Sequence, residues 1–166
     1  MSKNLHSTVI TDDIKSFLNA ESEPVYYQIE RQAIYNFSNA TGDENSLYND
    51  EIFARSSIYG TLIVPPLFIR SLRPMKYDPL FPEPFSHILD AGSKFFFIHP
   101  IRLGDTICVV KKLVDIFEKD GKMGKMLFRK TEITFKNQFG QVAAKEFNTI
   151  ITYGYGEKDP GIDDHG

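Results

Sequence analysis

Hydrophobic and polar positions follow two different periods along this chain. In residues 30–40 the apolar side chains stand three or four residues apart, which is the spacing of a helix with one buried face; they are Ala33, Ile34, Phe37 and Ala40. In the second half of residues 126–136 apolar and polar side chains alternate, so that Ile133 and Phe135 point to one side of a predicted strand. The pattern predicts helical segments first and long strands afterwards.

The same signals predict the remaining elements. A short helix with the apolar residues Ile14, Phe17 and Leu18 is expected, capped by Thr11 with Asp12 and Asp13 and ended by Pro24. Further helices are expected over 30–40, over 50–56, and from Pro66 to just before Pro74; the last is buried and contains Leu67, Phe68, Ile69 and Leu72. Strands are expected over residues 25–29, 95–98, 106–118, 126–136 and 142–153. A sheet with one apolar face covered by a buried helix is an α+β layer pair.

Two connections matter for the organisation of the chain. Residues 74–92 contain four prolines and no clear period, which predicts a long ordered loop that covers a site or an interface. Asp120-Gly121 predicts a hairpin whose connection, up to Lys125, is longer than a two-residue turn. We expect three parts: an N-terminal segment with a short helix (1–21), one domain (22–153) and a flexible tail (154–166).

A short polar loop, residues 41–48, closes the helix at 30–40. Gly42 permits a sharp exit from the helix, and the short polar side chains of Asp43 and Asn45 are suited to binding nearby backbone N–H groups. Ordinary turn chemistry is one explanation of this composition.

Residues 42–48, Gly-Asp-Glu-Asn-Ser-Leu-Tyr, also resemble the signature Gly-Asp-x-Asn-Pro-(aliphatic)-His of the MaoC-like (R)-specific enoyl-CoA hydratases and dehydratases. Further pieces fit the same family: Ala54-Arg55, Tyr59-Gly60, the run 102–105 and the run 137–140. The resemblance covers roughly residues 22–153 and is strongest to the amino-terminal (FAS1-type) half of double hot-dog dehydratases. It implies a single hot-dog fold, an antiparallel sheet wrapped around a central helix that starts near Pro66.

Two positions depart from the family pattern. Tyr48 replaces the histidine that, with the aspartate, activates water; a tyrosine base would need its pKa lowered by roughly three units, about 4 kcal/mol. Active members begin the central helix with His-Gly, whose Gly N–H faces the thioester oxygen, but here Pro65 and Pro66 offer no N–H. The resemblance therefore implies a catalytically impaired half that holds the acyl chain. The alternative for Tyr48 is a ring packed on the core.

The resemblance also implies the candidate site. The degenerate catalytic positions are Asp43, Asn45 and Tyr48, and the substrate-binding positions are Tyr59, Gly60, Pro65, Pro66 and Arg70. Near the mouth, Arg55, Arg70, Arg73 and Lys76 are candidates for the phosphates of coenzyme A or a carrier-protein arm, with surface solvation as the alternative. The histidines do not replace the missing one. His6 and His165 lie in the terminal segments, and a structural role is expected for His99. His87 lies in the proline-rich loop, from which reaching a neighbouring site is the alternative role considered for it.

Composition excludes several classes. With 166 residues, 42% of them hydrophobic, the chain can build one core, and a net charge of −3 gives no footprint for nucleic acid. Cys108, in an apolar run, is expected to point into the core, and a single cysteine is compatible with a reducing cytoplasm. Residues 1–10 lack a signal region, no stretch is long enough for a membrane span, and no metal-ligand spacing or cofactor motif is present.

Three hypotheses follow. The first is a hot-dog subunit of a heteromeric hydratase of enoyl-CoA or enoyl-carrier-protein, paired with a paralogous chain that carries the intact Asp and His. The second is a homodimeric acyl-CoA binding protein without catalysis. The third is a self-sufficient homodimeric hydratase or thioesterase that uses Asp43. In each case the ligand is an acyl thioester and no separate cofactor is needed.

Overall fold

The computed structural model describes residues 8–73, 81–122 and 124–154. In chain order its elements are α1 (Asp12–Ser16), β1 (Val25–Gln28), α2 (Arg31–Thr41), α3 (Ser46–Asn49), α4 (Glu51–Ser56), the 3-10 helix η1 (Pro66–Leu72), β2 (His87–Phe97), β3 (Thr106–Gly121), β4 (Gly124–Lys136) and β5 (Val142–Tyr153). The expected C-terminal tail lies, from residue 155 onward, outside the described residues.

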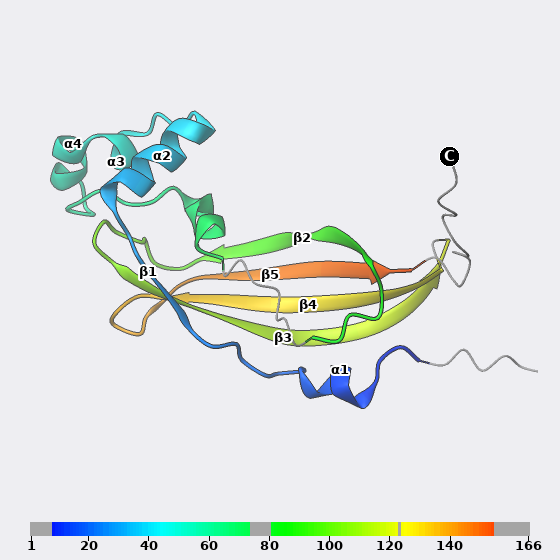
Figure 1. Cartoon of the computed structure of the whole chain (residues 1–166). Helices are drawn as coiled ribbons and strands as arrows, with labels where there is room; N and C mark the ends of the chain where they lie inside the picture. The colour runs from blue at the N-terminus through cyan, green and yellow to red at the C-terminus, as the bar shows by residue number, and fades with distance from the viewer. Residues whose placement is uncertain (1–7, 74–80, 123, 155–166) are drawn as a thin grey trace, which may run out of the picture.

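The five strands form one antiparallel sheet in the order β1-β3-β4-β5-β2. Figure 1 shows α2, α3, α4 and η1 gathered over one end of the sheet, while α1 lies on the side of β3. The segment after α1 contacts β3 directly, because Leu18 and Glu21 form β-bridges with it. The arrangement is the predicted α+β architecture, with β1 and β2 as the two edge strands.

One face of the sheet, here called the inner face, is buried. Alternate residues of β4 point to it, each at most 7% exposed: Leu127, Arg129, Thr131, Ile133 and Phe135. The prediction that Ile133 and Phe135 share a side is confirmed. Near the helices the inner face is apolar, since Phe135 pairs with Val109 and Ala144; farther along β4 it becomes polar.

The helix at Pro66 begins where it was predicted, but it is a seven-residue 3-10 helix. In this geometry residues three apart lie on the same face. Ile69 and Leu72 share the buried face, whereas Leu67 and Arg70 share the exposed one. The expectation that Leu67 is buried was therefore wrong.

Two strand predictions need correction. The expected loop 74–92 is shorter, because β2 already begins at His87; residues 74–80 lie outside the described residues. The β3–β4 pairing extends to Gly121 opposite Gly124, so the hairpin connection is tighter than predicted.

Cys108 does not point into the core as predicted. Its neighbours Ile107 and Val109 are fully buried on the inner face, and strand alternation turns Cys108 to the other face, opposite Tyr26 of β1. Its thiol is partly exposed.

Candidate functional site

The signature loop forms the hydrogen bonds expected for it. Gly42 ends α2 in the left-handed conformation, with a φ of 67°. The Asp43 carboxylate accepts the Asn45 N–H at 3.1 Å, and the Asn45 side chain accepts the Leu47 N–H at 3.0 Å. The second bond caps α3, a short helix inside the motif that was predicted as loop. Asp43 and Asn45 therefore organise the loop.

Two residues that sequence reasoning missed fasten this loop to α2. Ser38 is fully buried, and its hydroxyl donates to the Asp43 carbonyl. The Asp43 backbone N–H in turn donates to the Ser38 carbonyl at 2.9 Å. The Asn49 amide donates to the Ser38 hydroxyl at 2.9 Å and to the Asp43 carbonyl at 2.8 Å. One signal was available: Ser38 stands four residues after Ile34, on the apolar face of the helix.

Replacing Ser38 with alanine should destabilise the protein by about 1–2 kcal/mol, because it removes a buried hydroxyl that both donates and accepts. Urea denaturation measures this loss. The matched control is Ser56→Ala: that hydroxyl donates to the Phe53 carbonyl on the exposed side of α4, and its loss should change stability by less than about 0.5 kcal/mol. Equal losses of stability in the two variants would show that the Ser38 hydroxyl stabilises the protein no more than an exposed hydroxyl does.

Tyr48 is packed into the core, at 8% exposure. Burial raises the pKa of Tyr48 above its ordinary value of 10, and the nearby Asp43 carboxylate and Tyr59 raise this pKa further. The phenol is therefore protonated at neutral pH. The alternative of a ring on the core is confirmed.

The segment that leads into η1 lies beside the signature loop. The Ile63 N–H donates to the Leu47 carbonyl at 3.2 Å, which joins the two segments directly. Pro65 is buried and its carbonyl accepts the Phe68 N–H at 2.9 Å. Neither Pro65 nor Pro66 has an N–H to offer. The candidate positions Asp43, Tyr48 and Pro65 are thus brought into one region of the fold.

Tyr59 and Gly60 form the turn before that segment. The Tyr59 carbonyl accepts a hydrogen bond from the Arg102 guanidinium at 3.4 Å. The Tyr59 ring packs against the core beside Tyr48. Gly60 has a φ of 71° and donates its N–H to the Ser57 carbonyl at 3.1 Å.

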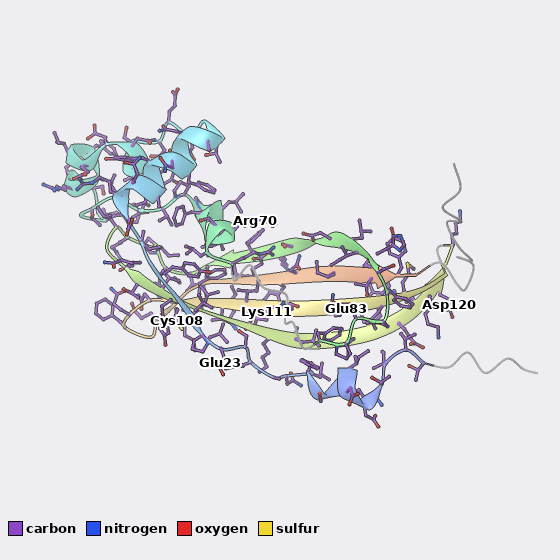
Figure 2. All side chains as sticks on the ribbon, in the orientation of Figure 1. Glu23, Arg70, Glu83, Cys108, Lys111 and Asp120 are labelled. Carbon is purple, nitrogen blue, oxygen red and sulfur yellow. The ribbon has the colours of Figure 1, made fainter. Side chains whose placement is uncertain are left out.

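The expected arginines near the mouth are differently engaged. Arg73 is only partly exposed: it holds the fully buried carboxylate of Glu146 on β5, with Nε at 2.9 Å and Nη2 on the second oxygen. Arg70, more exposed, lies with Nη1 3.8 Å from Glu146. Arg55 pairs with Glu51 at 3.3 Å on the surface. Lys76 is outside the described residues. Figure 2 shows Arg70 at η1, above the end of β2.

A depression of about 560 Å³ lies beside the signature loop. It is lined by side chains of α2, α3 and the loop, among them Gln32, Asn39, Asp43, Glu44 and Asn49. None of the histidines in the described residues lines it. His99 is exposed and donates its backbone N–H to Ala143 at 3.0 Å, and the His87 ring stacks on Tyr153 with centroids 5.2 Å apart.

In the part of the chain that the structure describes, no three metal-binding side chains are grouped together. None of the helices described is both long and apolar enough to cross a membrane.

Comparisons with known proteins place these features in context. The family model described as "FAS1-like, dehydratase domain region" matches residues 16–146. A UPF0336 protein of Saccharopolyspora erythraea is 26% identical over 155 residues, 90% of this chain and 97% of the relative. A UPF0336 protein of Streptomyces avermitilis is 28% identical over 95 residues, 54% of this chain and 63% of the relative, so the match spans less than two thirds of that protein.

Three solved structures are similar. One is the ChsH1-ChsH2 complex from Mycobacterium tuberculosis, with a TM-score of 0.76 and 16% identity over 89% of this chain and 97% of that one. The C-terminally truncated HadBC (3R-hydroxyacyl-ACP dehydratase) complex of the same organism has a TM-score of 0.68 and 20% identity, covering 81% and 96%. The R-hydratase PhaJ1 of Pseudomonas aeruginosa has a TM-score of 0.64 and 17% identity, covering 89% and 92%. At these identities the similarity shows the fold alone.

Proposed function

Because this chain belongs to the family of the FAS1-like dehydratase domain region and has the hot-dog fold, we propose that it is the acyl-chain-binding, non-catalytic subunit of a heteromeric MaoC-like enoyl-thioester hydratase or dehydratase. The partner would be a paralogous chain with the intact Asp and His. The substrate would be an enoyl thioester of coenzyme A or a carrier protein, as in fatty acid metabolism, and the reaction that of a lyase.

The state of Tyr48 is the observation that carries this proposal. Hydration adds the hydroxyl of water to the β-carbon and a proton to the α-carbon, so it needs a base that titrates near the working pH. Burial and the Asp43 carboxylate move the pKa of Tyr48 upward, away from that range. Tyr48 then does not replace the histidine that would orient the attacking water beside Asp43, and the Asp43 carboxylate already accepts the Asn45 N–H.

The start of η1 supports the same conclusion independently. The developing negative charge on the thioester oxygen requires a donor, and losing one such donor typically reduces catalysis by about 10²–10³-fold. By the resemblance, Pro65 and Pro66 occupy the positions where active members supply this N–H. Both lie at the start of η1, and neither has an N–H.

The free edge of β2 supports association with a second hot-dog subunit. β2 pairs only with β5 among the described strands, so its other edge has unpaired backbone groups. Exposed apolar side chains flank this edge on both faces, each 42–53% exposed: Ile88, Leu89, Phe96, Phe97 and Ile98. An unprotected edge of this kind is suited to the addition of another strand. Two of the similar structures are complexes, ChsH1-ChsH2 and HadBC.

Placing a charge on this edge should weaken the association. Phe97→Lys is expected to raise the dissociation constant of the dimer at least tenfold, because the lysine must leave water at the interface. This applies whether the chain associates with a second copy or with the partner chain. Sedimentation velocity measures the change. Phe139→Lys is the control, since Phe139 is 77% exposed in the turn after β4. A dimer that tolerates Phe97→Lys as well as Phe139→Lys would place the interface elsewhere.

An enoyl-CoA hydration assay tests the function. This chain alone should hydrate crotonyl-CoA and longer enoyl-CoA substrates at no more than about 10⁻³ of the rate of its complex with the partner. Comparable rates with and without the partner would establish a self-sufficient enzyme instead. Saturable acyl-CoA binding without hydration by any pairing would identify an acyl-CoA binding protein.

A further inference from the structure

Arg129 lies in an unusual position for an arginine. It belongs to β4 and points to the inner face, where the strand register places it between Ile116 of β3 and Ile150 of β5. The side chain is 7% exposed. An arginine is seldom buried to this extent unless its charge and its N–H groups are matched.

The segment 81–86 covers this residue. In Figure 1 this green segment runs from the start of β2 across β5 and β4 toward β3, and Figure 2 shows Glu83 on it. Glu83 accepts from Arg129 Nη1 at 2.6 Å. The Phe81 ring lies against the Arg129 guanidinium, with its centroid 4.4 Å from Cζ. The same ring also contacts the ring of Phe17, with 5.3 Å between the two centroids. Charge and orientation of Arg129 are thus fixed.

Three buried polar atoms at this position have no hydrogen-bond partner in the structure: Arg129 Nε, Arg129 Nη2 and Thr152 Oγ1. Thr152 is 1% exposed and lies diagonally across from Arg129 on β5, opposite Leu127. Side chains in this diagonal relation are within reach of a long residue. Buried donors without an acceptor are rare in folded proteins.

Arg73 shows what such a pair of atoms does. It uses Nε and Nη2, the same two atoms, to hold the two oxygens of the Glu146 carboxylate side-on. In Arg129 these two atoms are parallel donors with the third nitrogen already bound to Glu83. The arrangement fits a planar two-oxygen acceptor, which is the geometry of a carboxylate.

We propose that Arg129 binds the carboxylate of a ligand with a hydrocarbon chain, with Thr152 donating to one of its oxygens. The neighbours on the inner face, Ile116, Leu127 and Ile150, provide apolar surface for the chain. The carboxylate can come from a free fatty acid or from the far end of an ω-carboxyacyl thioester. Only the second source rests on the function proposed above. Because the site is closed in this structure, the ligand enters when the cover shifts aside from Nε and Nη2 while Glu83 keeps its pair with Nη1.

Isothermal titration of the full chain tests this site, with four probes: dodecanoate, methyl dodecanoate, the mono-CoA thioester of dodecanedioic acid and dodecanoyl-CoA. Dodecanoate should bind at least tenfold more tightly than its methyl ester if free acids are the ligands. The dicarboxylic thioester should bind at least tenfold more tightly than dodecanoyl-CoA if the thioester is the source. If neither pair of probes shows tighter binding of the carboxylate, the proposal is overturned.

Variants assign the preference to Arg129. Arg129→Met removes the charge, and Arg129→Lys keeps it but loses the side-on pair of donors; each should reduce the preference for the carboxylate at least tenfold. Lys130→Met is the control, because Lys130 points to the opposite face and pairs with Asp115 at 2.9 Å. Circular dichroism verifies that each variant is folded. If both arginine variants unfold, Thr152→Val replaces them as the test, and it is expected to weaken binding of the carboxylate severalfold. A preference that survives all three substitutions overturns the proposal. No hydration is measured, so failure here leaves the proposed function standing.

Discussion

Replacing Glu146 with glutamine is expected to lower the free energy of unfolding by about 3–5 kcal/mol. The Glu146 carboxylate is fully buried in the sheet and holds Arg73 through two hydrogen bonds, with Arg70 nearby. Removing its charge leaves the Arg73 guanidinium partly buried without a counter-charge, which is the costly way to break such a pair. Urea denaturation, with an unchanged slope against denaturant, measures the loss.

Two further variants show whether the buried charge is responsible. Glu132→Gln breaks the pair with Lys145, 2.6 Å apart and partly exposed, and should reduce stability by no more than about 1 kcal/mol. The double variant Arg73→Met/Glu146→Met removes both charges and should be more stable than Glu146→Gln, because no unpaired charge remains. A double variant less stable than Glu146→Gln would mean that the pair contributes through its geometry.

Truncating Tyr48 to alanine is expected to destabilise the protein by about 3–5 kcal/mol, whereas Tyr48→Phe should lose less than about 1.5 kcal/mol. The alanine variant leaves a cavity in the core cluster that contains Tyr48, but phenylalanine keeps the ring. Thermal and urea denaturation measure both. The same Tyr48→Phe variant, in complex with the partner, should hydrate enoyl-CoA at the unaltered rate. A large loss of hydration in Tyr48→Phe would give the hydroxyl a chemical role.

The raised pKa of Tyr48 adds a pH signature. A folded-state pKa above the unfolded value of about 10 means that the folded state keeps this proton longer. The contribution is fully present below pH 10 and is lost as the pH rises from there through the folded pKa. The stability of the unaltered protein should therefore fall more steeply above pH 10 than that of Tyr48→Phe.

Local patterns predicted much of this fold. Alternation identified β4 and its buried residues Ile133 and Phe135, and β5 has the predicted bounds, Val142–Tyr153. The start of β2 was missed because its first half, with a register shift between Asp90 and Ser93, has no regular alternation. Cys108 was misplaced because an apolar run does not reveal which of its members face the core.

The candidate site was predictable only where the motif is local. The signature loop and its Asx hydrogen bonds follow from Gly42, Asp43 and Asn45, which are neighbours in sequence. The ion pair of Arg73 with Glu146 joins residues 73 positions apart, and the contact of Glu83 with Arg129 depends on a crossing of the sheet. Spacing along the chain carries no signal for such contacts.

Substituting the aspartate of each subunit in turn tests most directly whether this chain is the non-catalytic half. In the reconstituted complex, Asp43→Asn in this chain should leave the hydration rate of enoyl-CoA within about threefold of the unaltered complex, since Asp43 here serves the loop. The corresponding substitution in the signature of the partner should reduce the rate by at least about 10³-fold. A comparable collapse on Asp43→Asn, with folding and assembly intact, would contradict the account.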